Sequence, residues 1–286
     1  MKTNQNLRFY WRKTHNKLML GLSYISVIIG LFWLCWILFT LITKGIPALS
    51  IDLFTQSTPA PNEKGGLLNA LIGSFFIVGA GTLIGTPIGV LAGTYLAEYG
   101  RYSRFAQITR FLNDILLSAP SIIIGLFVYS LYVSKIEHFS GWAGAFALAL
   151  LLIPIVVRTT DNMLLLVPNN LREAAAALGC SQWQVIMMIC YRAAKSGILT
   201  GVLLAVARIS GETAPLLFTA LSNQFLSWNM NEPIANLPVV IYQYAASPFT
   251  DWNNLAWAGA ALITLFVLCL NIFTRLFFQH KNNEAI

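Results

Sequence analysis

The sequence predicts an all-α membrane protein with six transmembrane helices. Of its 286 residues, 57% are hydrophobic and only 10% are charged, whereas about 25% of the residues of a typical soluble domain are charged. A soluble fold of this size cannot bury so much apolar surface. The apolar residues also form long continuous runs instead of alternating with polar ones, which excludes a transmembrane β-barrel.

Five runs contain no charged residue and no histidine, and each approaches or exceeds the about 20 residues that a spanning helix needs. They are residues 18–43, 65–97, 115–134, 139–157 and 252–274. A sixth apolar segment, at about 196–222, contains two charges. The first run is too long for a signal peptide and no cleavage site follows it, so we expect it to be retained. The runs divide the chain into a basic leader (1–17), a first transmembrane helix (18–43) and a core domain (66–279).

The distribution of Lys and Arg predicts the orientation of these helices. Fourteen of the 18 basic residues fall in the leader, in the loops after the second and fourth spans, and after the last span. The loop from Ser222 to Asp251, on the opposite side, contains none. Because cytoplasmic loops carry an excess of Lys and Arg, both termini are expected in the cytoplasm.

The second predicted span contains a regular glycine pattern. Gly81, Gly85, Gly89 and Gly93 recur every four residues and share one helix face, where small residues allow another helix to approach closely. This contact is either static packing or a sliding surface that moves during transport. Pro87 is expected to bend the same helix.

The loop between the fourth and fifth spans, at about 168–196, predicts two short helices. The alanine-rich stretch from Arg172 to Leu178 favours a helix, Gly179 suits a left-handed cap, and Ser181 is a good first cap for a second helix. We expect both helices to lie across the cytoplasmic end of the bundle, where the bundle or a partner covers their apolar side. That side contains Trp183, Ile186, Met187 and Ile189.

The spacing in this loop resembles a known family. Glu173, Ala174 and Ala175, followed by Gly179 and Ile189, resemble the EAA loop of ABC-importer membrane subunits. The segments "RISGETAPLLFTALSNQF" (208–225) and "IPIVVRTTDN" (153–162) resemble, more narrowly, the permease subunits of bacterial phosphate ABC importers. The sequence departs from many EAA loops in having Tyr191-Arg192 in place of Leu-Pro.

The resemblance implies a fold, a location and partners. The fold is a type-1 importer (MetI-like) bundle with cytoplasmic coupling helices, in the bacterial inner membrane. The partners are a second homologous permease, two ATP-binding subunits and a periplasmic phosphate-binding protein. Glu173, Ala174, Ala175, Gly179 and Ile189 are then the residues of ATPase coupling.

We expect the chain itself to bind no cofactor and to catalyse no reaction. It contains no G-x-x-x-x-G-K-[ST] loop for ATP phosphates, so ATP hydrolysis is expected in a partner subunit. Its four cysteines match no metal-site spacing.

Arg208 and Glu212 are the strongest candidates for the substrate pathway. Arg208 lies eleven residues beyond Gly197, or about 16 Å along a helix, which is near the midplane of a bilayer core. A central charge costs at least about 2.5 kcal/mol, so some gain must offset it. The planar arginine fork suits phosphate oxygens. Ser210 and Thr213, as hydroxyl donors, and Arg158 are further candidates; Arg158 alternatively sits at the lipid headgroups.

Three alternatives remain at this point. Arg208 and Glu212 are four residues apart, are expected to share one helix face, and can form a self-neutralising pair that only specifies helix packing. The permease can serve another oxyanion, such as molybdate or sulfate. Finally, the chain can be a secondary transporter in which Glu212 carries a proton, and such a protein would need no ATPase.

Overall fold

The computed structural model describes residues 2–279, and for residues 2–10, 275 and 277–279 it describes the backbone alone. This part of the chain consists of helices and loops, without a β-strand. Within the described residues, five helices are long and apolar enough to cross a membrane, and a bent helix pair brings the number to six if it counts as one span. The predicted all-α membrane fold is confirmed.

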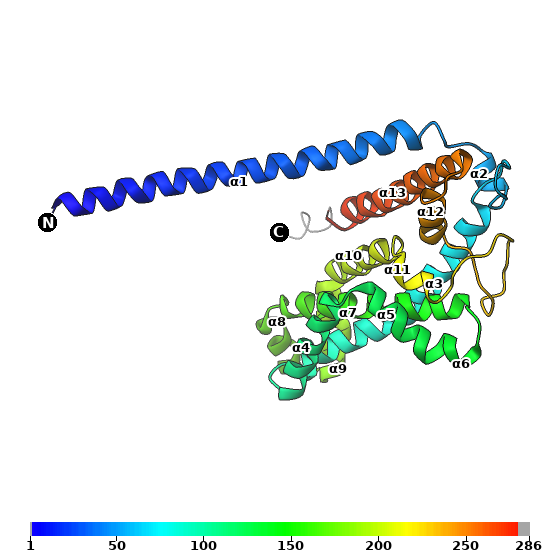
Figure 1. Ribbon diagram of the computed structural model, residues 1–286. Helices are drawn as coiled ribbons and strands as arrows, with labels where there is room; N and C mark the ends of the chain where they lie inside the picture. The colour runs from blue at the N-terminus through cyan, green and yellow to red at the C-terminus, as the bar shows by residue number, and fades with distance from the viewer. Residues whose placement is uncertain (1, 280–286) are drawn as a thin grey trace.

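The first helix, α1 (Lys2–Gly45), projects from the rest of the molecule (Figure 1). The predicted leader and the predicted first span belong to one continuous helix. The described side chains of α1 are exposed along nearly its whole length. Only its C-terminal end packs, where a Cβ on Gly45 would lie 2.8 Å from the Cβ of Ala261 in α13 (Thr250–Gln279). Because the rest of this chain leaves the apolar helix uncovered, lipid or another subunit must surround it.

The centre of the bundle is the contact between α3 (Leu68–Thr94) and α7 (Gly141–Leu165). The predicted glycine face lies here, with all four glycines buried: Gly81, Gly85, Gly89 and Gly93. A Cβ on Gly81 would lie 3.0 Å from the carbonyl oxygen of Ala145, and one on Gly93 would lie 2.7 Å from the Cβ of Thr160. The two backbones therefore touch along three turns, and the contact is made within one subunit.

The third predicted span, 115–134, is wrong as a straight helix. The helix α4 (Arg104–Ser118) is followed by a second helical segment, which consists of α5 (Ser121–Val128), η2 (Tyr129–Val133) and α6 (Ser134–Ile136). The two meet at an angle of 100°. The break is at Ala119 and Pro120, which both have extended backbone angles. Proline lacks the N–H that a continuing helix needs, and it disfavours helical angles at the residue before it.

The loop after α7 contains one separate short helix, not two. The helix α8 (Asn169–Ala177) ends at Gly179, whose φ of +85° confirms the predicted left-handed turn. From Gln182, however, α9 (Gln182–Val185), the π-helical turn η3 (Ile186–Cys190) and α10 (Tyr191–Ile209) run on as one 28-residue span. No glycine or proline interrupts residues 182–196, so the second short helix is simply the start of the fifth span.

The end of this span also differs from the prediction. The helix α10 stops at Ile209 instead of near residue 222, and a turn leads to the short helix α11 (Ala214–Leu217). The segment between Ser222 and Asp251, expected to be a loop, contains the largely buried helix α12 (Leu237–Ala245). Asn236 caps α12 by accepting the N–H of Val239. This short helix lies between α3 and α13.

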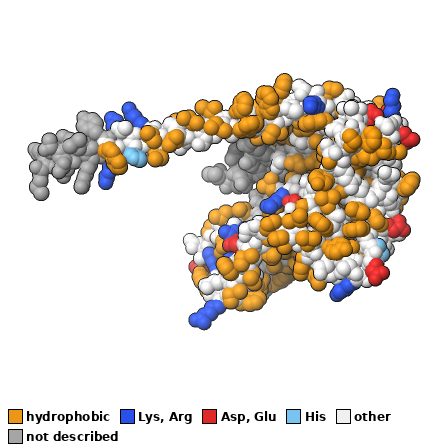
Figure 2. Space-filling view, in the orientation of Figure 1, with side chains coloured by type: hydrophobic (Ala, Val, Ile, Leu, Met, Phe, Trp, Pro, Cys, Tyr) orange, Lys and Arg blue, Asp and Glu red, His pale blue; other side chains and the backbone are white. Residues whose placement is uncertain are grey.

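The elements divide between two sides of the molecule. The beginning of α1, the end of α13 and the helix α8 lie toward one side, whereas α2 (Asp52–Thr55) and α12 lie toward the other (Figure 1). Hydrophobic side chains cover much of α1 and of the visible face between these sides (Figure 2). This arrangement agrees with the two-sided distribution of basic residues in the sequence.

Candidate functional site

A cavity of about 250 Å³ lies where α10 ends. Arg208 and Glu212 line it on one side, and the bend between α4 and α5, residues 116–121, lines it on the other. The Arg208 Nε lies 4.0 Å from the Glu212 Oε1, while 58% of the arginine side chain and 19% of the glutamate side chain are exposed. The pair is therefore loose, and the guanidinium retains donors for another anion.

The end of α10 explains this geometry. Arg208 is in the last turn of the helix, where free carbonyl groups favour a cation. Glu212 is beyond the helix, in a turn closed by its N–H donating to the Ile209 carbonyl at 3.2 Å. The prediction that both residues share one helix face is thus wrong, although the turn still brings the two side chains together.

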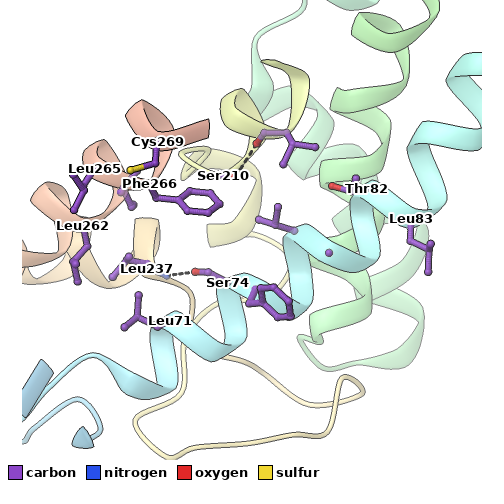
Figure 3. A pocket seen from close by; sticks show the side chains of 15 residues that line it. Leu71, Ser74, Thr82, Leu83, Ser210, Leu237, Leu262, Leu265, Phe266 and Cys269 are labelled. Atoms are coloured by element: carbon purple, nitrogen blue, oxygen red, sulfur yellow. Dashed lines mark hydrogen bonds between the residues drawn. The ribbon is translucent and has the colours of Figure 1, made fainter. Parts of the chain in front are cut away.

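Ser210 and Thr213, the predicted hydroxyl donors, do not line this polar cavity. Ser210 Oγ donates to the Val206 carbonyl at 2.7 Å, and Ser210 faces a different cavity of about 680 Å³ (Figure 3). Apolar side chains such as Leu262 and Phe266 dominate that second cavity. No charged side chain is among the described residues that line the larger cavity. Because an anion would lose its hydration there without gaining a counter-charge, this cavity is a poor route for phosphate.

Arg158 likewise lies outside the polar cavity and has a partner of its own. Its Nη1 donates to both carboxylate oxygens of Asp114, at 2.9 and 3.1 Å, and about half of each side chain is exposed. Asp114 was not among the predicted site residues. The signal was present, because Asp114 precedes one apolar run and Arg158 follows the next, so that an outward and an inward span bring them to the same side.

Two further ion pairs were also missed. Arg110 pairs with Asp161 at 2.7 Å, which ties α4 to α7. Arg172 of α8 pairs with Glu98 of the π-helical turn η1 (Tyr95–Tyr99), also at 2.7 Å. The hydrogen bond to Glu98 raises the pKa of the Arg172 guanidinium, against the opposing effect of burial. The two partners are 51 positions apart in the first pair and 74 in the second, so no local spacing in the sequence reveals either pair.

The residues with EAA spacing are divided between surface and core. Glu173, Ala174 and Gly179 are exposed, whereas Ala175 is buried and Ile189 is partly buried. The neighbouring Leu178, Trp183, Met187 and Met188 are exposed as well. This end of the molecule therefore presents an acidic residue beside large apolar side chains, a surface suited to a protein partner.

A model of the family described as "binding-protein-dependent transport system inner membrane component" matches residues 85–282. The chain belongs to this family. The match contains the glycine face from Gly85 onward, the bend, the EAA-type loop and the Arg208–Glu212 pair, so the features described above lie within the part that defines these permeases.

Curated relatives of this permease extend over nearly the whole chain. A phosphate transport system permease protein PstA from Pasteurella multocida is 74% identical over 277 residues, which cover 97% of this chain and 99% of that protein. The corresponding protein of Yersinia pestis is 61% identical and covers 96% of this chain and 93% of its own length. A probable phosphate permease PstA from Methanocaldococcus jannaschii is 36% identical, over 95% and 96% of the two chains.

Solved structures share the fold of this permease at low sequence identity. A chain of a bacterial alginate ABC transporter, solved with its pentasaccharide-bound periplasmic protein, superposes with a TM-score of 0.62 at 14% identity, over 93% of this chain and 96% of that one. A chain of the inward-facing MetNI methionine ABC transporter gives a TM-score of 0.56 at 20% identity, over 73% and 92%. The predicted type-1 importer bundle is confirmed.

Proposed function

We propose that this permease is a membrane subunit of an ATP-driven importer of inorganic phosphate in the bacterial inner membrane. The observation that supports this proposal most directly is the loosely paired, half-exposed Arg208 in a polar cavity within the membrane-spanning part. An arginine offers phosphate a planar fork with a permanent charge. Glu212 holds this guanidinium when no anion is present and keeps the affinity low enough for release. The names of the curated relatives support phosphate as the anion.

The energy comes from outside this chain. Two ATP-binding subunits hydrolyse ATP and dock on the end that contains α8, through the exposed Glu173 and Gly179 and the apolar surface around Trp183. This end faces the cytoplasm, as do both termini. A second, homologous permease completes the pathway, and a periplasmic phosphate-binding protein delivers the anion to the opposite side. The chain binds no cofactor of its own.

The test is phosphate uptake by vesicles that contain the complete complex. We expect uptake of radiolabelled phosphate when ATP is inside the vesicles and the neighbouring ATP-binding subunits are present, and no uptake without those subunits. Molybdate and sulfate should compete weakly. Uptake that follows a proton gradient in the absence of the ATP-binding subunits would instead establish a secondary transporter, and preferential uptake of molybdate or sulfate would change the assigned substrate.

A further inference from the structure

Arg172 joins three elements at the end of the bundle that contains α8. Its Nη2 and Nε donate to the two Glu98 carboxylate oxygens at 2.7 and 3.1 Å. The same guanidinium donates to the carbonyl groups of Leu164, at 2.8 Å, and Val167. Only 15% of the Arg172 side chain and 7% of the Glu98 side chain are exposed. One guanidinium thus connects the start of α8 with η1 and with the end of α7.

A second contact ties the start of α10 to the same region. The hydroxyl groups of Tyr191 and Thr94 lie 2.7 Å apart. Thr94 is the last residue of α3 and directly precedes η1, while Tyr191 is the first residue of α10 and directly follows η3. Both joints are therefore made at π-helical turns, which hold one extra residue and commonly occur at functional positions in helices.

These contacts form a continuous mechanical connection. The start of α8 is fixed to η1 by a charge-assisted, two-point hydrogen bond, which is stronger and more directional than a single contact. From η1 the connection continues into α3, and through Thr94 and Tyr191 into α10, whose far end carries Arg208. A displacement of α8 without η1 would leave the largely buried Glu98 carboxylate without its partner, which is unfavourable.

We propose that Arg172 and Glu98 are positioning residues that transmit the movement of α8 to the pathway helices α3 and α10. The inference rests on the proposed function, because it takes α8 as the element that the ATP-binding subunit moves. It goes beyond that function in naming the intramolecular joint. Without the joint, the ATP-binding subunit still docks and still hydrolyses ATP, but the movement of α8 no longer reaches α3 through η1.

The test compares transport with hydrolysis in the reconstituted complete complex. Glu98→Gln keeps the size and an acceptor oxygen but removes the charge. We expect the complex to assemble and to hydrolyse ATP, while phosphate transported per ATP falls about tenfold, a typical size for coupling between sites. Asp161→Asn is the matched control, because it breaks the similarly buried Arg110–Asp161 pair, which does not involve α8. It should lower thermal stability without lowering the transport ratio.

Two further variants keep the test decisive. If Glu98→Gln does not assemble, Arg172→Lys keeps the charge but loses the fork, and it should lower the ratio less. Tyr191→Phe removes the contact between the Tyr191 and Thr94 hydroxyl groups. Combined with Glu98→Gln or with Arg172→Lys, it should lower the amount of phosphate transported per ATP further. An unchanged ratio in assembled Glu98→Gln or Arg172→Lys complexes, or an equal loss in Asp161→Asn, overturns the proposal. Failure of the proposed function is distinguishable, because the wild-type complex itself would then show no ATP-dependent uptake.

Discussion

Two arginine–glutamate pairs among the described residues have the same chemistry and opposite settings. Arg208 and Glu212 are four residues apart, 4.0 Å from each other and border a cavity. Arg172 and Glu98 are 74 residues apart, meet at 2.7 and 3.1 Å and are largely enclosed. The first arginine retains free donors, whereas the second uses its donors on a carboxylate and on two backbone carbonyls.

This difference separates binding from positioning. A guanidinium that is to bind a passing anion must keep donors unused and must release its partner easily. A guanidinium that is to hold two segments together must satisfy its donors, because a buried unpaired charge is costly. Burial and hydrogen-bond geometry, not residue type, are therefore the basis on which we propose the two roles.

The largest expected effect comes from breaking the loose pair at its arginine. Arg208→Gln removes the charge and most of the fork, and should lower phosphate uptake roughly 100-fold, as expected for the loss of charge-assisted hydrogen bonds. Insertion and ATPase binding should remain. Arg208→Lys keeps the charge without the fork, and its uptake should lie between those of the wild type and of Arg208→Gln. The measurement is uptake of radiolabelled phosphate. The control is Arg104→Gln, which changes an exposed arginine at the start of α4. Near-normal uptake by Arg208→Gln would remove Arg208 from the pathway.

The next effect concerns the other end of the molecule, at the turn after α8. Gly179 has a φ of +85° and its Cβ position is open. Gly179→Leu therefore causes no clash but strains the backbone by about 1–2 kcal/mol and changes how α8 is presented. We expect loss of uptake and weaker co-purification of the ATP-binding subunit, with normal insertion. Gly179→Asn, which tolerates left-handed angles, should retain most activity. Normal transport by Gly179→Leu would show that this turn is not part of the ATPase contact.

The sequence predicted the membrane class and the turn at Gly179, because each depends on local composition. Long apolar runs specify spans, and glycine readily adopts the left-handed angle there. The sides of the membrane, read from the basic residues, stay a prediction. The bend at Pro120 was also visible in the sequence, since proline cannot continue a helix. It was missed because an uncharged run was taken to be one straight span.

The partners of the charged residues could not be predicted in the same way. Glu98 and Arg172 come together only because α3 packs along α7, and the depth of that contact depends on four glycines acting over three turns. The position of α12 was also hidden, because its nine mostly apolar residues are too few for a span and its burial depends on packing between α3 and α13. Arg208 and Glu212 were found because their charges contrast with their apolar neighbours.

A smaller effect should come from the glutamate of the loose pair. Glu212→Gln frees Arg208 from its partner, so phosphate should bind more tightly and leave more slowly. We expect the maximal uptake rate to fall several-fold while the phosphate concentration for half-maximal uptake decreases. Kinetics at several phosphate concentrations separate the two quantities. The double variant Arg208→Gln/Glu212→Gln should remain inactive; normal transport by the double variant would mean that the pair serves packing alone.

The smallest effect is expected at Arg158 and Asp114. This pair is intermediate between the other two, because its hydrogen bonds are short but about half of each side chain is exposed. Exposed pairs contribute less than ~1 kcal/mol to stability, so neither single variant should lower the melting temperature appreciably. Arg158→Gln removes a positive charge from the predicted cytoplasmic end of the pathway and should lower uptake less than tenfold. Asp114→Asn breaks the same pair but keeps the charge, and should leave uptake unchanged or slightly higher. An equal reduction by both variants would instead mean that the pair acts as a tie between α4 and α7, and Arg158 would then have no role in phosphate exit.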